Sequence, residues 1–249
     1  MATIQIFLTS GSSWAVPSDW NPANNTIEVI GASGASGGGN GGSGGGAGAG
    51  AYSKVSNIYL SGNVSYSVGT GGTPTATLGG DGGNTWFNGT SLSSASVSAE
   101  GGKGGAGGPS GASGTGGLAA NGIGTTKYSG GNGSAGVSGS YSGAGGGAAG
   151  LNGAGGNAVT TTGGSADNDT LAGGLANAVG KNGTEWTASY GSGSGGGGLT
   201  GPNPGKAGGI YGGAPSGTAS VVAENGITGT QGLIVITYTP QTSNFFLMF

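Results

Sequence analysis

The sequence contains no cysteine, no histidine and no arginine, and charged residues make up only 5% of the chain. Without cysteine there can be no disulfide framework and no thiolate chemistry. Without histidine the commonest general base and the commonest zinc ligand are missing. The net charge of −3 argues against a surface that neutralises nucleic-acid phosphates. We therefore predict no nucleic-acid partner, no metal site and no cofactor.

Long apolar runs are absent as well, so we predict no membrane insertion. The first ten residues have no basic start and no continuous apolar core, which argues against a signal peptide and favours synthesis in a cytoplasm. Serine and threonine are abundant, but no motif selects a Ser–Lys pair among the five lysines. The run Asp167, Asn168, Asp169 resembles the start of a calcium loop, but the glycine and glutamate that complete it are missing. We predict no catalytic residues and no enzyme activity.

Glycine is what the chain has in excess, with 69 of 249 residues. Within the tract 101–117 a glycine stands at every third position. A period of three is neither helical nor strand-like; it is the period of the polyproline II conformation. The structural glycines predicted here are Gly102, Gly105, Gly108, Gly111, Gly114 and Gly117.

Polyproline II segments make no internal hydrogen bonds, so their backbone groups must find partners elsewhere. A glycine at every third residue clears one face of side chains, and a neighbouring backbone can then approach and bond. We interpret the tracts as a bundle of short polyglycine II helices. The alternative is a flexible linker, which is the usual meaning of Gly/Ser-rich sequence. Ordering such a residue costs about 1–2 kcal/mol, so the bundle should need a hydrophobic module that clamps its ends.

Strand patterns flank the tracts and predict an all-β fold with little or no α-helix. The expected strands cover residues 2–9, 14–16, 26–30, 52–60, 64–68, 93–99 and 232–238. The turn 61–63 predicts that the fourth and fifth of these pair as a hairpin. The segment 166–182 has leucines at helical spacing, but Gly173 and Gly174 limit it to a turn or two.

Several motifs give the chain a family resemblance. They are TIQIFLTSGSSWAVPSDWNPANNTIEVIG from Thr3, then GAYSKV, SYSVGTGG, TWFNGT, GIGTTKYSGGNG and the closing GLIVITYTP. Over residues 2–240 the set resembles the glycine-rich proteins of tailed bacteriophages, of the tail-fibre or minor structural type. In related adhesins, bundled polyglycine II helices carry loops that bind the host receptor. A glycine-rich extracellular domain of animal receptor kinases is a more remote resemblance.

The resemblance implies a non-enzymatic virion protein that is exposed on the assembled particle. Its implied partners are a host surface glycan or outer-membrane protein, other virion proteins, and copies of itself, with a trimer as one arrangement. Two alternatives stand: a head or tail decoration protein without receptor binding, and an ice-binding protein with a flat face of small side chains.

Aromatic residues within the glycine-rich half are the receptor-binding candidates, because Trp and Tyr dominate binding hot spots. For each of them, capping the end of the bundle is the competing role. The candidates are Tyr128, Tyr141, Trp186, Tyr190 and Tyr211.

We predict one domain over residues 1–240, with a strand framework at 2–100 and 232–240 and a glycine-rich bundle at 31–50 and 101–217. Residues 241–249 form an apolar C-terminal tail. Its last five side chains are predicted to be an assembly interface with another subunit, because leaving them in water would be unfavourable. These are Phe245, Phe246, Leu247, Met248 and Phe249.

Overall fold

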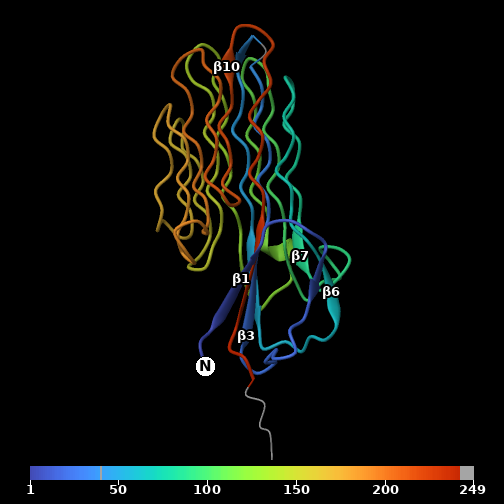
Figure 1. Ribbon diagram of the computed structural model, residues 1–249. Helices are drawn as coiled ribbons and strands as arrows, with labels where there is room; N and C mark the ends of the chain where they lie inside the picture. The colour runs from blue at the N-terminus through green and yellow to red at the C-terminus, as the bar shows by residue number, and fades with distance from the viewer. Residues whose placement is uncertain (40, 242–249) are drawn as a thin grey trace, which may run out of the picture.

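The protein is an all-β molecule in which short sheets stand at one end of a bundle of extended glycine-rich segments (Figure 1). The computed structural model describes residues 1–39 and 41–241. Its one helical element is the 3₁₀ turn η1 (Ala119–Asn121), and among the described residues no helix could span a membrane. The predicted fold class, all-β with little or no α-helix, is confirmed.

Two antiparallel sheets form the framework. The first has the order β1 (Ile4–Leu8), β11 (Leu233–Tyr238), β3 (Asn25–Ile30), β5 (Tyr52–Ser56), β9 (Thr126–Tyr128). The second has the order β2 (Ser13–Ala15), β6 (Asn63–Ser67), β7 (Thr85–Phe87), β8 (Val97–Ala99). Every strand predicted from the pattern overlaps one of these strands, and β11 is buried along nearly its whole length, as its continuous apolar run predicts.

The hairpin predicted at residues 52–68 is wrong. β5 pairs with β3 and β9, whereas β6 pairs with β2 and β7, so the two strands belong to different sheets. The chain leaves the first sheet at Asn57, which has φ of 57° and donates its N–H to the Asn25 carbonyl at 2.9 Å. The Asn25 side chain accepts the next N–H, from Ile58, at 3.1 Å. These bonds direct the chain away before the turn at Gly62 can fold it back.

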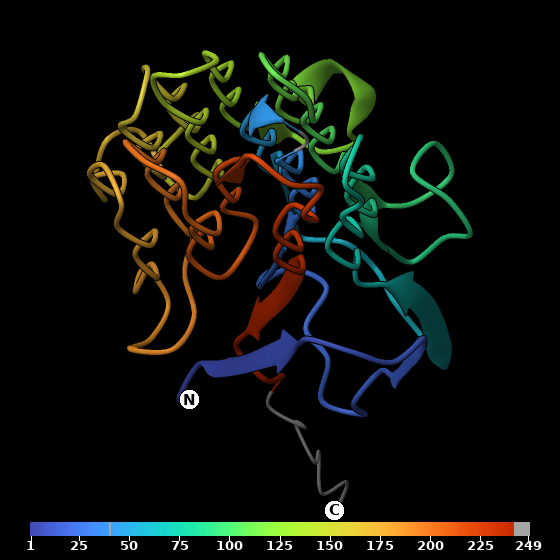
Figure 2. The same ribbon diagram turned by 90° about the horizontal axis from the view of Figure 1, so that it is seen from above.

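Above the sheets, extended segments run up and down the molecule and bond to one another through their backbones (Figures 1 and 2). The segment 43–51 is central. Its successive N–H groups donate to carbonyls of three different neighbouring segments in turn. Each of these neighbours therefore accepts a bond from every third residue of the central segment. One such row joins Gly45 to Ala106 (2.8 Å), Gly48 to Lys103 (2.9 Å) and Ala51 to Glu100 (3.0 Å).

The carbonyls of the same segment accept bonds from three further segments in the same rotation. Residues 31–37, 111–117 and 143–149 supply the donors. Segment 43–51 therefore has six bonded neighbours, and its backbone is satisfied without any strand ladder along most of its length. This three-residue period is the one that polyglycine II helices require, and polyglycine II stays our interpretation of these segments.

The glycine spacing explains the close approach. A Cβ built at Gly102, Gly105, Gly111, Gly114 or Gly117 would lie closer than 3.0 Å to a neighbouring backbone atom. Gly108 differs from this prediction: its Cβ would meet nothing within 4 Å, and its φ of +107° places it in a turn. The tract therefore folds into two segments, 101–107 and 111–117, that bond to each other on either side of this turn, and Gly108 is needed for backbone conformation instead.

Two segments outside the predicted tracts also join the bonded array. Ala32 and Ala35 donate their N–H groups to residues 83 and 80, and Ser33 and Ser36 donate theirs to residues 230 and 227. Residues 69–83 connect β6 to β7 and carry paired glycines, whereas residues 226–232 lead into β11 with a glycine at every third position. The bonded array is therefore wider than residues 31–50 and 101–217.

At the outside of the bundle, side-chain oxygens replace missing backbone acceptors. Asn132 Oδ1 accepts the Gly116 N–H at 2.8 Å, and Asn157 Oδ1 accepts the Asn132 N–H at 2.8 Å. Asp81 Oδ1 accepts the Gly104 N–H at 3.0 Å. Each outer segment thereby satisfies donors that have no further segment beside them.

We predict that Gly114→Val destabilises the protein much more than Ser113→Val. Gly114 faces the backbones of residues 103 and 48, whereas Ser113 in the same tract is exposed. Overpacking and a lost backbone bond should together cost about 2–4 kcal/mol. For a chain of this length that lowers Tm by roughly 5–15 °C. Thermal unfolding followed by circular dichroism checks this, and equal Tm values for the two variants would contradict the packing.

Candidate functional site

We call the end of the bundle farthest from the two framework sheets the distal end (Figure 1). Its turns carry exposed apolar side chains. The short sheet of β4 (Gly42–Ser43) and β10 (Ala219–Ser220) lies at this end. Successive segments reverse direction there. The turns cover residues 75–78, 108–110, 137–141, 159–162, 175–179, 200–203 and 219–224.

Most of these turns expose a large aliphatic residue to solvent. Val221 is 84% exposed, Leu175 71% and Val159 66%. The other exposed aliphatic side chains of these turns are Leu78, Val137, Val179 and Val222. Charge is almost missing, since Glu224 is the one charged residue in the turns named above. Turns that expose apolar side chains among neutral polar residues are typical of an interaction surface.

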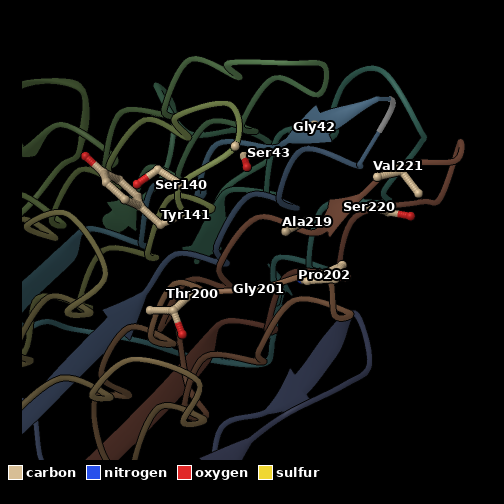
Figure 3. A pocket seen from close by; sticks show the side chains of 11 residues that line it. Gly42, Ser43, Ser140, Tyr141, Thr200, Gly201, Pro202, Ala219, Ser220 and Val221 are labelled. Atoms are coloured by element: carbon tan, nitrogen blue, oxygen red, sulfur yellow. The ribbon is translucent and has the colours of Figure 1, made fainter.

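A hollow of about 310 Å³ opens at the centre of the distal end (Figure 3). Four chain segments line it: β4, residues 139–141, residues 200–202, and residues 219–221. The lining is mainly backbone and small side chains. In Figure 3 the Tyr141 ring points away from Ala219 and Pro202, so it stands at the rim. The hollow offers hydroxyl and backbone groups to a ligand, with no charged side chain in its lining.

Buried contacts hold these turns in place. Leu199 is fully buried directly before Thr200, and its N–H is donated to Ser142 Oγ at 3.0 Å. Asn177 Nδ2 donates to Thr200 Oγ1 at 3.0 Å and ties a second turn to the same place. Asn203 and Ala219 exchange backbone bonds of 2.9 and 3.2 Å. The site therefore rests on bonded turns.

The aromatic candidates separate into two groups. Tyr141 lies at the distal end, where its carbonyl accepts the Val137 N–H at 2.8 Å. The other four belong to one cluster next to the first sheet, at the opposite or proximal end of the bundle. These four are Tyr128, Trp186, Tyr190 and Tyr211. The structure thus does not bring Tyr141 together with the other four candidates.

The proximal cluster has the geometry of a cap. Phe7 of β1 stacks on Tyr190 with ring centroids 4.0 Å apart, and Tyr190 stacks on Tyr211 at 5.8 Å. Tyr52 of β5 stacks on Tyr128 at 6.1 Å. The rings therefore join the sheet to the start of the bundle. This placement favours the capping role for the four residues, while a receptor contact by them stays a prediction.

A buried carboxylate organises the same cluster. Glu28 in β3 is only 5% exposed, and it accepts the Tyr52 hydroxyl at Oε1 (2.5 Å) and the Trp186 indole N–H at Oε2 (3.0 Å). These bonds stabilise a charge that would otherwise be costly to bury. Burial, reinforced by Glu28, raises the pKa of the Tyr52 hydroxyl far above its usual range, so Tyr52 stays a donor. No sequence motif pointed to Glu28.

Two further carboxylates, Asp167 and Glu185, lie beside this cluster. Asp167 is fully buried, and the Asn152 backbone N–H and side-chain amide donate to its two oxygens at 2.5 Å each. Glu185 accepts the Ser192 N–H at 2.9 Å. Burial raises the pKa of Glu185, and the charge of Asp167 adds to that rise. Among the described residues, no group of three or more His, Cys, Asp or Glu could hold a metal ion.

We predict that Glu185 makes the protein less stable as the pH rises. Its pKa in the folded state lies above the ordinary value of 4.5. Between the ordinary pKa and the raised one, the folded state therefore binds more protons than the unfolded state. The free energy of unfolding falls as the pH rises through the raised pKa. Glu185→Gln removes this fall and keeps an acceptor for Ser192. The Tm of the variant minus that of the wild type should grow from pH 4 to pH 7.

The control is Glu224→Gln, which removes an exposed carboxylate at the distal end. Its Tm should follow the wild type across the same pH range. A Glu185→Gln difference that stays flat with pH would contradict the assignment.

The predicted assembly interface, Phe245, Phe246, Leu247, Met248 and Phe249, lies outside the described residues and stays a prediction.

No family model matches the chain, and no curated protein matches it in sequence.

Proposed function

We propose that the chain is a virion protein of a tailed bacteriophage that binds a receptor on the host surface through its distal end. The observation that carries the proposal is the gathering of exposed aliphatic side chains, with almost no charge, on turns at one end of a stiff bundle. The motifs quoted above support the phage setting. The proposal needs no catalytic group, and the distal hollow contains no acid, base or cation.

The geometry supports a division of labour between the two ends. Sheets and aromatic stacks fix the proximal end, so the turns at the distal end are presented on a scaffold with a satisfied backbone. Loops that a rigid scaffold positions are where binding residues concentrate. The turns can vary in sequence with little cost to the bundle, because the interior bonds run between backbones. Receptor recognition is a function that such a design suits.

The uncharged surface also limits the partner. Binding to an anionic polysaccharide would call for a basic patch, and the distal turns contain no lysine. Aliphatic side chains instead fit a protein surface with apolar loops, such as an outer-membrane protein. A neutral glycan is the second candidate, through the hydroxyl groups of the hollow. The decoration and ice-binding alternatives stay predictions.

Adsorption of virus particles that carry single variants tests the proposal. Val221→Asp and Tyr141→Ala change exposed or rim residues of the distal end, and we expect each to weaken adsorption by roughly tenfold or more, as hot-spot losses do. Tyr59→Asp is the matched control, because Tyr59 is 77% exposed in the loop that joins β5 to β6. It should leave adsorption unchanged.

Tyr190→Ala separates capping from binding. It breaks the stack between Phe7 and Tyr211, so we expect a lower Tm, with adsorption kept by the particles that still assemble. Unchanged adsorption by both distal variants would overturn the proposed receptor site.

A further inference from the structure

The outer edge of β1 is the one long sheet edge in the described residues that nothing protects. β1 is the last strand of the first sheet, and β11 is its single strand partner. Among the described residues, no backbone hydrogen bond joins β1 to any other segment. Such an edge presents a row of unpaired N–H and C=O groups, which is a template for another strand.

The sequence of β1 lacks the usual protection. It reads IQIFL, with no charged residue and no proline, and its pairing with β11 runs over five residues without a bulge. Proteins normally protect edges with lysine, proline, bulges or short strands. The apolar side chains Ile4, Ile6, Phe7 and Leu8 also stay partly exposed, whereas the neighbouring strand β11 is almost fully buried.

Among the described residues, the other edges of the two framework sheets are protected. β9 has three residues and contains Lys127, and η1 lies beside it. β2 has three residues and is followed closely by Pro17. The open side of β8 is bridged by Ile123, which exchanges bonds of 2.9 and 3.0 Å with Ser98. The contrast indicates that β1 is kept open for a partner.

We propose that the partner is a second copy of this chain, with the two β1 strands pairing antiparallel about a two-fold axis. A two-fold axis places the same uncharged strand on both sides, so the pairing is self-complementary and closes at two copies. With the two-fold axis perpendicular to the sheet, the apolar face of one copy also lies on the same side as the apolar face of the other. Partly exposed Ile4, Ile6 and Leu8 of one copy extend the apolar face of the other. The result is one continuous sheet across the dimer.

Light scattering of the purified full chain tests the dimer, and we expect twice the mass of 22.8 kDa for one chain. Gln5→Lys adds a charge at an exposed position of β1. Like charges then lie near one another across the two-fold axis, and the variant should become monomeric at concentrations where the wild type is dimeric. Ser13→Lys adds the same charge to the exposed edge strand β2 and should stay dimeric.

Disulfide trapping gives a second measurement that does not depend on weakening the dimer. The chain has no cysteine, so Gln5→Cys introduces a unique thiol. Mild oxidation should form a covalent dimer with Gln5→Cys and not with Ser13→Cys. A monomeric wild type, a trimer, or a dimer that Gln5→Lys leaves intact and Gln5→Cys fails to trap would overturn the proposal. These outcomes are independent of receptor binding.

Discussion

The backbone hydrogen bond between neighbouring extended segments is the interaction on which the structure depends. In segment 43–51 each N–H and each C=O reaches a different neighbour in a rotation of three. Such a bond contributes only about 0.5–1.5 kcal/mol net, and it forms only where two backbones come close. Glycine at every third residue permits that approach, which is why a Cβ at Gly111 or Gly114 would collide with backbone.

These bonds alone do not overcome the entropy of ordering so much glycine. The framework supplies conventional burial at one end. One apolar cluster lies between the two sheets and includes Trp20, Ile27, Phe87 and Ile236. A second joins the first sheet to the bundle through Tyr52, Tyr211 and Leu233. The chain enters and leaves the two framework sheets repeatedly, so these sheets anchor several bundle segments at the proximal end. The distal turns therefore take no part in the framework sheets.

Much of this organisation could be predicted from the residues. The apolar runs predicted β1, β3 and β11. Five of the six glycines that the spacing predicted face a neighbouring backbone, but the spacing did not predict the turn at Gly108. The sheet that β6 joins could not be predicted, because the turn at Gly62 fits a hairpin equally well. The sequence also did not predict at which end of the bundle each aromatic residue lies. Tyr141 and Trp186 both lie between tracts, and the number of reversals between them decides the end.

The functional surface was the hardest part to predict, for the same reason. Val159, Leu175 and Val221 are far apart in sequence and look like isolated aliphatic residues in polar surroundings. They gather only because each lies where a segment reverses at the distal end. The buried role of Glu28 could not be predicted either, because a glutamate in a strand usually faces water. Tyr52 comes from the neighbouring strand β5, but Trp186, the second donor to Glu28, lies on a segment that arrives more than a hundred residues later.

Amide hydrogen exchange followed by NMR tests the central claim most directly. In the outer segment 111–117 the N–H groups of Gly111, Gly114 and Gly117 are bonded to the central segment, and that of Gly116 is donated to Asn132 Oδ1. The N–H groups of Ala112, Ser113 and Thr115 are bonded to no group among the described residues. We predict slow exchange at Gly111, Gly114, Gly116 and Gly117 but not at the three residues between them, and slow exchange at successive residues in 44–51. Uniformly fast exchange in both segments, or protection that alternates every second residue, would contradict the account.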